Sequence, residues 1–422
     1  MNLNLITYII TAIFLLQTIK THPKVVINNI TKEETRNETE TEIAGYTCYS
    51  GYILANETSG AYLFFVYIER NTSNPLQLVL AGGPGCSSSD DLFLALGPSL
   101  IQPDGSFINN SNAWTDIFNL LFIDNPVGSG YSYIDDPDGY PTNQSLVSQQ
   151  LYTSLLVFFD KYNISQDKDF YIYGASYCGK YIPALGYKIL QEGFVINLKG
   201  VIIGDGITDP VSQMNYSYYA YATGLIGELQ YPIIHAKELE CVNLMQNESW
   251  LDAANCMIDI WGEIVNMSGG VNVYDIRLYG DYNFTALDNF MQSNSTKETF
   301  GVDLNTTWWD CDGPPTHYLY EDMPKSVKSD FEALLANGTK IFLYTGQFDL
   351  IITLVGSLNF LSNVNWEYMD DFNNSTRIIW KVDDEMAGFV KHYKNLWFGT
   401  IVDQAKHTHN LAYRFVNDLP FD

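Results

Sequence analysis

The stretch DFYIYGASYCGKYIP, from Asp169 to Pro183, decides the fold. Its first part, FYIYG over residues 170–174, is a short apolar and aromatic run that predicts a buried strand. The residues Ala-Ser-Tyr-Cys-Gly follow at once and lead into a helical pattern over residues 180–192. A serine at the apex of such a turn needs small neighbours, and Gly174, Ala175 and Cys178 supply them. The stretch therefore predicts a strained strand-to-helix turn that presents Ser176.

Further apolar runs predict more buried strands: Leu76–Ala81, Leu120–Asp124, Lys199–Gly206, Lys340–Gly346 and Leu396–Val402. Residues 144–162 carry apolar side chains at helical spacing between two of these runs. Strands that alternate with helices predict a mainly parallel sheet with helices on both faces. A serine turn after a strand of such a sheet is the nucleophile elbow of an α/β-hydrolase.

The segment 207–320 breaks this rhythm, because it is rich in Tyr, Asn and Trp and has few strand-like runs. We expect it to be a cap inserted into a core made of residues 45–206 and 321–422. Residues 1–22 contain a short apolar run that predicts a signal peptide, with an uncleaved anchor as the alternative. Residues 23–44 are polar and charged, which predicts a flexible leader.

The net charge of −27 argues against nucleic acid or an anionic membrane surface as a partner. Asn-x-Ser/Thr acceptors recur along the chain, which is typical of glycoproteins of the secretory pathway. We expect a protein that is secreted or resides in a lysosomal or vacuolar lumen, with no membrane partner beyond secretory targeting. The six cysteines show no metal-ligand spacing, and nothing in the sequence indicates a metal or cofactor.

Several motifs occur in one order: GGPGCSS at 82–88, IDNPVGSGYSY at 123–133, the elbow, and YTGQFDLI at 344–351. Together they resemble the serine carboxypeptidase family, and IDNPVGSGYS, INLKGVIIGDGITDP and GQFDLII look most like its vitellogenic-type members. The resemblance runs from about residue 45 to 415. It implies an α/β-hydrolase fold, a peptide substrate and cleavage of C-terminal residues through an acyl-enzyme.

The resemblance assigns a role to each matching position. Ser176 would be the nucleophile, His407 the general base and Asp349 the carboxylate that orients the histidine. The order Ser…Asp…His is the one found in α/β-hydrolases. An unassisted serine hydroxyl is a poor nucleophile, whereas imidazole can take and return its proton near neutral pH. The backbone N–H groups of Gly83 and Tyr177 would form the oxyanion hole.

The segment AKHTHNLAY, residues 405–413, departs from the family pattern because Lys406 replaces a glycine before the histidine. His409 is therefore an alternative base. In an extended segment both histidines would point the same way, so the spacing alone does not choose between them.

The family also binds the C-terminal carboxylate of its substrate through an asparagine and two glutamates, which here are Ala81, Ala175 and Ala95. Only the backbone N–H of Gly82 survives as a substrate-binding donor. Lys406 could supply a replacement charge, although a solvent-facing lysine is the simpler interpretation. The sequence thus keeps the residues for the chemistry and loses those that hold the substrate's end.

The resemblance also implies a disulfide between Cys86 and Cys311. We expect Cys241 to pair with Cys256 in the cap, and Cys48 and Cys178 to stay free, with Cys178 filling a small slot behind the nucleophile.

Three functions remain open at this point: a serine-type carboxypeptidase, an esterase or acyltransferase on the same fold, and a catalytically silent secreted binding protein. The sequence leaves the oligomeric state open.

Overall fold

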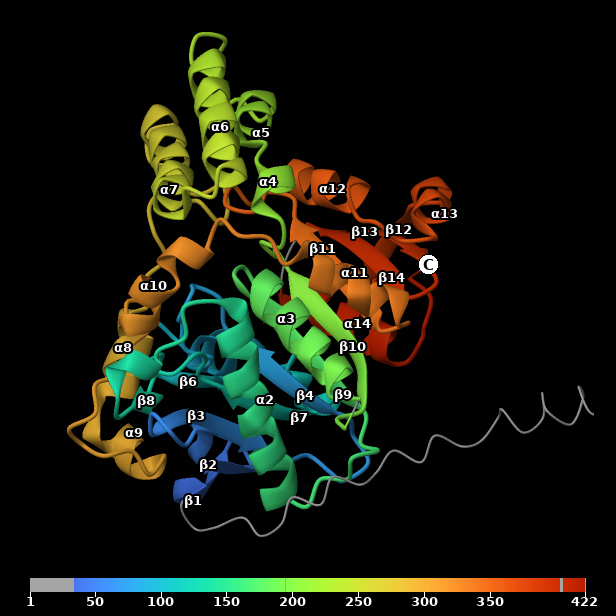
Figure 1. Ribbon diagram of the computed structural model, residues 1–422. Helices are drawn as coiled ribbons and strands as arrows, with labels where there is room; N and C mark the ends of the chain where they lie inside the picture. Colours follow the sequence, from blue (N-terminus) through green and yellow to red (C-terminus); the bar gives the residue numbers. More distant parts are fainter. Residues whose placement is uncertain (1–33, 194, 403–404, 422) are drawn as a thin grey trace, which may run out of the picture.

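The computed structural model describes residues 34–193, 195–402 and 405–421, which form a twelve-stranded sheet covered by helices on both faces (Figure 1). The strand order is β1-β2-β3-β7-β4-β9-β10-β11-β14-β13-β12, with β8 paired to β3. The strands span Thr35–Ile43 (β1), Tyr46–Asn56 (β2), Ala61–Ile68 (β3), Leu76–Leu80 (β4), Asn119–Ile123 (β7), Tyr133–Ile134 (β8), Phe170–Ala175 (β9), Leu198–Gly204 (β10), Lys340–Gly346 (β11), Ile378–Val382 (β12), Glu385–Tyr393 (β13) and Leu396–Ile401 (β14).

The six central strands β7, β4, β9, β10, β11 and β14 run parallel, and antiparallel strands flank them on both sides. All six coincide with apolar runs of the sequence, so the prediction of an α/β-hydrolase fold with a mainly parallel sheet is confirmed. Because parallel strands end at one edge, the loops after β9, β11 and β14 meet there. The three predicted triad residues follow these strands.

Both faces of the sheet are buried, which explains why its central strands read as continuous apolar runs. On β9, Phe170 and Ile172 face one core, whereas Tyr171 and Tyr173 face the other. Helices α2 (Gln144–Lys161), α3 (Cys178–Gln191), α11 (Lys328–Ala336) and α12 (Leu354–Ser362) cover the first face. Helix α14 (Ala405–Val416) contributes to the second face.

Part of the predicted flexible leader is ordered. Residues 35–43 form β1, which pairs antiparallel with β2 along most of its length. The segment TRNETETEI has polar residues on both faces of the strand and buries little apolar surface, so its composition resembles that of a flexible leader. Backbone pairing with the neighbouring strand decides its conformation instead. The predicted signal peptide and residues 23–33 lie outside the described residues.

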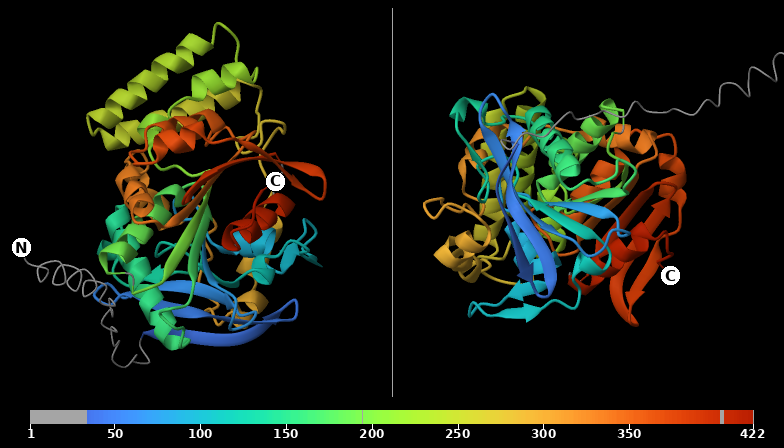
Figure 2. Two further views of the ribbon diagram at one scale, coloured as in Figure 1. Left: turned by 90° about the vertical axis from the view of Figure 1, so that its right-hand side faces the viewer. Right: turned by 90° about the horizontal axis from the view of Figure 1, so that it is seen from below.

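The inserted segment 207–320 has two parts (Figures 1 and 2). Helices α4 (Pro210–Gln213), α5 (Tyr216–Ala222), α6 (Tyr231–Gln246) and α7 (Trp250–Met267) gather beyond the carboxyl edge of the sheet. Helices α8 (Thr285–Gln292), α9 (Asn294–Thr299) and α10 (Pro314–Tyr318) lie along the side of the core. There Ser50 Oγ donates to the Phe300 carbonyl at 3.1 Å, and Trp308 Nε1 to Ser87 Oγ at 3.2 Å. Among the described helices, none combines the length and apolar character that crossing a bilayer requires.

Disulfides join Cys86 to Cys311 and Cys241 to Cys256, and Cys48 and Cys178 are buried free thiols, which confirms the predicted pairing. The first bridge joins residues that are 225 positions apart in the sequence. It links the segment just before α10 to the GGPG loop.

We expect the double substitution Cys86→Ser/Cys311→Ser to lower the free energy of unfolding by about 2–5 kcal/mol, because a long loop is released in the unfolded chain. The measurement is chemical denaturation, with Cys241→Ser/Cys256→Ser as the control because that bridge spans only 15 residues. A smaller loss for the long loop than for the short one would contradict the expectation.

Candidate active site

Ser176 occupies a strained backbone position at the turn between β9 and α3. Its φ angle is +60°, a left-handed conformation that is uncommon for residues other than glycine. Its N–H donates to the Gly204 carbonyl at 2.9 Å, and its own carbonyl accepts from Gly179 N at 2.9 Å and Ile207 N at 3.0 Å. These bonds to the turn and to the end of β10 hold the elbow in place.

The small residues of the elbow are required by the space around it. A Cβ on Gly174 would come within 2.6 Å of both Cys178 Sγ and the Leu80 carbonyl oxygen. The Cys178 thiol itself donates to the carbonyls of Leu80 and Ala81 at 3.2 and 3.1 Å, and burial raises its pKa. Cys178 therefore fills the predicted slot behind Ser176, as an inert packed thiol.

The GGPG loop lies against the elbow. A Cβ on Gly82 would approach the Ala175 carbonyl oxygen to 2.8 Å and Ser176 Cβ to 2.9 Å, so only glycine allows this contact. Gly83 follows with φ +109°, which also favours glycine. The loop thus brings main-chain groups beside Ser176 and Tyr177, where the predicted oxyanion hole would lie.

Asp124 anchors the far end of this loop, a role that the sequence motif alone did not reveal. Its carboxylate accepts from Ser87 Oγ at 2.6 Å, Ser88 N at 3.0 Å and Tyr131 N at 2.9 Å. Burial raises its pKa to about 6, although these hydrogen bonds oppose the shift. The sequence feature that could have indicated this role is the position of Asp124, directly after the apolar strand β7.

Asp349 follows β11 and is buried. Its Oδ1 accepts from Ile352 N at 2.8 Å, and its carboxyl lines a cavity of about 160 Å³ together with Gly346 and with Tyr274 and Arg277 of the insertion. Burial and then the neighbouring Asp205 raise the pKa of Asp349 well above its usual range.

Asp205, at the end of β10, is a second carboxyl that sequence reasoning missed. It accepts from Gly346 N at 2.7 Å, and a Cβ on Gly346 would lie 3.6 Å from Asp205 Oδ1 and 3.9 Å from Asp349 Cβ. Burial raises the pKa of Asp205 to about 7. The two carboxyls therefore share one buried site, where two full negative charges repel each other.

We expect Asp205→Asn to shift the acid limb of kcat/KM to lower pH by about one unit. Removing a competing negative charge makes Asp349 easier to ionise, and the ionised form is the one that supports an imidazolium. The groups around the pair are the phenols of Tyr216, Tyr219, Tyr274 and Tyr344, which stay neutral across this range, and the ion pair of Asp275 with Arg277, 2.8 Å apart.

The matched control is Asp330→Asn, because burial also raises the pKa of Asp330, to about 6, but this residue lies on α11 and does not follow a central strand. An acid limb that stays in place in Asp205→Asn, or moves equally in the control, would contradict the expectation.

His407 and His409 both lie on α14, so the interpretation of residues 405–413 as an extended segment is wrong. Two residues apart on a helix, side chains are rotated by about 200° and point in different directions. The His407 ring is buried with its centroid 5.9 Å from that of Trp380 on β12. His409 is turned to another side, where burial lowers its pKa and Asp116 opposes the shift.

Lys406 does not serve the vacated carboxylate site. Its ammonium lies 2.9 Å from an Asp383 carboxylate oxygen and 3.5 Å from one of Glu385, both at the exposed hairpin between β12 and β13. The simpler interpretation of a surface lysine therefore holds. Ala81 and Ala175 follow the paired residues Leu80 and Gly174 of adjacent strands, beside the elbow.

One group of side chains within the described residues has the composition of a metal site: Asp90, Asp310 and Cys311. The Cys311 sulfur is already bonded to Cys86, so it offers no thiolate. Acidic side chains without a further ligand do not define a metal centre.

Comparison with known proteins agrees with this geometry. The family model for serine carboxypeptidases matches residues 38–413. The serine carboxypeptidase S10 family member 1 of Dictyostelium discoideum is 34% identical over 366 residues, covering 82% of this chain and 86% of that protein. The venom serine carboxypeptidase of Apis mellifera is 29% identical, covering 94% and 90%.

Among solved structures, the prohormone-processing carboxypeptidase Kex1Δp of Saccharomyces cerevisiae superposes with a TM-score of 0.79 at 23% identity, covering 88% of this chain and 92% of that one, and it shares the fold. The finer assignment to the vitellogenic type stays a prediction. The strained serine turn, the glycine loop against it and a family match across most of the chain lead to one conclusion: this protein belongs to the serine carboxypeptidase family and is a serine-type hydrolase with the α/β-hydrolase fold.

Proposed function

We propose that Ser176, His407 and Asp349 form a catalytic triad that hydrolyses acyl bonds at the C-terminal end of peptides. The observation that carries the proposal is the left-handed Ser176 with Gly82 pressed against it. This arrangement places the Ser176 side chain beside the main chain of a glycine loop, which suits acyl transfer. Asp349 and the start of α14 follow neighbouring strands of the same parallel sheet.

In the proposed reaction, His407 takes the proton of the Ser176 hydroxyl as the oxygen attacks the scissile carbonyl. The N–H groups of Gly83 and Tyr177 stabilise the oxyanion, and Asp349 stabilises the imidazolium. His407 then gives its proton to the leaving amine, and an acyl-enzyme remains on Ser176. Water, activated by the same imidazole, hydrolyses the ester and regenerates the serine.

A cavity of about 930 Å³ between the insertion and the core can receive the peptide. Thr316, on its wall, donates to the Pro84 carbonyl at 3.0 Å, so the cavity adjoins the GGPG loop. Its aromatic and polar walls include Tyr318, Tyr320 and Asn143. We therefore place substrate binding between α7, α10 and the start of α2, which gives the inserted segment a role in substrate selection and none in the triad.

The alanines at the three positions where the family binds the terminal carboxylate favour a second candidate on the same machinery, an esterase or acyltransferase. Ala81, Ala95 and Ala175 cannot bind a terminal carboxylate through their side chains. Losing a partner for a charged group costs about 1.5–3 kcal/mol for each hydrogen bond. Substrates without a free C-terminal carboxylate would thus compete well with ordinary peptides.

We expect kcat/KM for a blocked dipeptide with a free C-terminus to exceed that for the matching ester by less than about tenfold, with activity rising from pH 4 to 8. A glutamic acid that binds a carboxylate must be protonated and favours low pH, whereas here the rise follows deprotonation of the triad. The measurement is kcat/KM for the acid, its amide and its ester at each pH.

A strong preference for the free acid, largest at low pH, would contradict this expectation. Asp91→Asn is the companion variant, because burial raises the pKa of Asp91 to about 7 and this residue lies one helical turn before Ala95. If the preference for the free-acid substrate disappears in this variant, Asp91 is the carboxyl group that binds the substrate's C-terminal carboxylate.

We also propose that the protein works in the secretory pathway, as a secreted or lumenal enzyme. The two disulfides require an oxidising compartment in which to form. The Asn-x-Ser/Thr acceptors fit the same route. Detection of N-linked glycans on the protein from its native source tests this localisation.

A further inference from the structure

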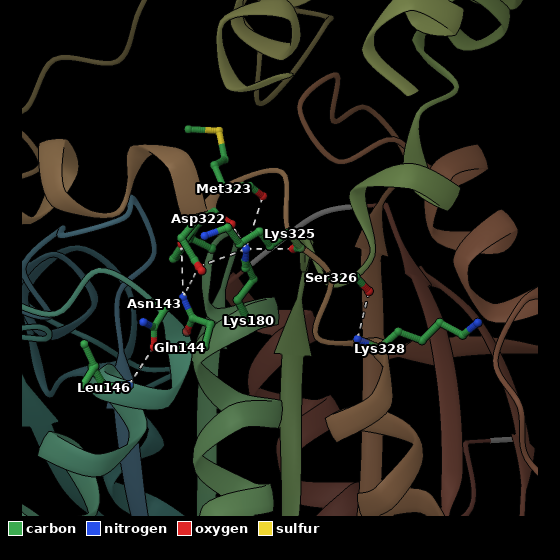
Figure 3. Close-up of polar contacts among 10 residues, drawn as sticks. Asn143, Gln144, Leu146, Lys180, Asp322, Met323, Lys325, Ser326 and Lys328 are labelled. Carbon is green, nitrogen blue, oxygen red and sulfur yellow. Dashed lines mark hydrogen bonds and ion pairs between the residues drawn. The ribbon is translucent and has the colours of Figure 1, made fainter. Parts of the chain in front are cut away.

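A buried ion pair lies directly behind the elbow. Lys180 Nζ lies 3.1 Å from Asp322 Oδ2, and the two side chains are 0% and 3% exposed. The ammonium also donates to the main-chain carbonyls of Asp322, of Met323 at 3.3 Å and of Lys325 at 2.8 Å (Figure 3). Helix α3, which begins at the elbow, is thereby fastened to the turn that follows α10.

The same carboxylate oxygen, Asp322 Oδ2, accepts hydrogen bonds from two neutral donors. Tyr177 OH and Gln144 Nε2 each donate to Asp322 Oδ2 at 2.7 Å, and the two donors lie 3.2 Å from each other. Figure 3 shows Gln144, Lys180 and Asp322 converging from α2, α3 and the turn. Three segments far apart in the sequence therefore meet at one buried oxygen atom.

This arrangement constrains Tyr177 along its whole side chain. The residue is 1% exposed, and its ring packs edge-on against that of Tyr181 with centroids 5.0 Å apart. Tyr181 OH in turn accepts from Gly85 N at 3.3 Å, in the GGPG loop. With its phenol bonded at one end and its backbone in the elbow at the other, Tyr177 has little freedom to rotate its peptide N–H.

We propose that Asp322 is a positioning residue, whose carboxylate holds the Tyr177 phenol and so aims the Tyr177 N–H at the oxyanion. This inference rests on the proposed function, because it assumes that this N–H is an oxyanion donor. A preorganised donor contributes to catalysis only while its direction is fixed, and a displacement of about 1 Å can cost about 10²-fold in rate.

The ion pair holds the carboxylate in place. A buried carboxylate without a partner would protonate or draw in water. Burial lowers the pKa of Lys180 to about 8, with Asp322 opposing the shift, so the ammonium is still charged at neutral pH. Lys180 and Asp322 thus stabilise each other in the buried site, and the Asp322 carboxylate in turn holds the Tyr177 hydroxyl.

The test compares an oxygen ester with its thionoester in the parent protein, Asp322→Asn and Tyr177→Phe. Sulfur accepts hydrogen bonds poorly, so the thionoester depends less on the oxyanion donors. We expect both variants to lower kcat for the oxygen ester by about ten- to hundredfold, with KM nearly unchanged and the thionoester much less affected.

Tyr177→Phe keeps the ion pair and removes only the hydroxyl, so it remains informative if Asp322→Asn fails to fold. The control is Lys328→Gln, which breaks the partly exposed pair with Glu332, 3.6 Å apart, a few residues beyond the turn. We expect this control to change neither ester's kcat.

Hydrogen exchange of the peptide 174–182 provides a readout that does not depend on activity. We expect its amides to exchange at least tenfold faster in Tyr177→Phe than in the parent. Unchanged exchange, or equal losses for the two esters, would overturn the positioning role. A parent protein without Ser176-dependent turnover would instead reject the proposed function, and the exchange rates would still decide whether Asp322 holds the turn.

Discussion

Ser176→Ala is expected to abolish labelling by a fluorophosphonate probe and to lower hydrolysis of any accepted peptide or ester by about 10⁴–10⁶-fold. In the proposed mechanism the substitution removes the oxygen that forms the acyl-enzyme, whereas the proposed oxyanion donors stay in place. Lost packing alone would not produce an effect of this size, because the substitution removes one oxygen atom from a half-buried side chain and leaves its Cβ in place.

This experiment also separates the enzyme from a silent binding protein. If the parent protein does not react with the probe although its fold is intact, the catalytic proposal is rejected and the binding alternative remains. Ser88→Ala serves as the control, because Ser88 is a buried serine after the GGPG loop whose hydroxyl donates to Asp124 Oδ1 at 3.3 Å. We expect probe labelling of that variant to continue.

His407→Ala is expected to lower turnover by about 10⁴-fold or more, and His409→Ala by no more than a few-fold. Without a base at this position the Ser176 hydroxyl is not activated, and no proton is available for the leaving group. The two side chains leave α14 in different directions, so they cannot substitute for each other. The measurement is kcat/KM for one ester substrate in both variants.

If His409→Ala loses the activity and His407→Ala keeps it, the base has been assigned to the wrong histidine. Thermal unfolding of both variants excludes misfolding as the cause. Both rings are largely enclosed, with His407 against Trp380, so a modest fall in melting temperature is expected in each case.

The sequence by itself determined the six parallel strands and the elbow. Short apolar runs such as residues 170–174 and 340–346 indicate such strands, because a strand buried on both faces must be apolar throughout. The small residues around Ser176 are likewise a local requirement, since Gly174 and Gly82 leave no room for a Cβ. The disulfide of Cys86 with Cys311 came from the family resemblance and not from spacing.

Only the tertiary structure decided the features that depend on pairing between distant segments. Strand β1 has the composition of a loop and is held by its hydrogen bonds to β2. His407 and His409 lie on a helix, although the sequence around them was interpreted as an extended segment. The carboxyl pair of Asp205 with Asp349, and the contact of Tyr177 with Asp322, join residues about 145 positions apart. Local propensity carries no information about such contacts, because burial and charge pairing arise only when the chain is folded.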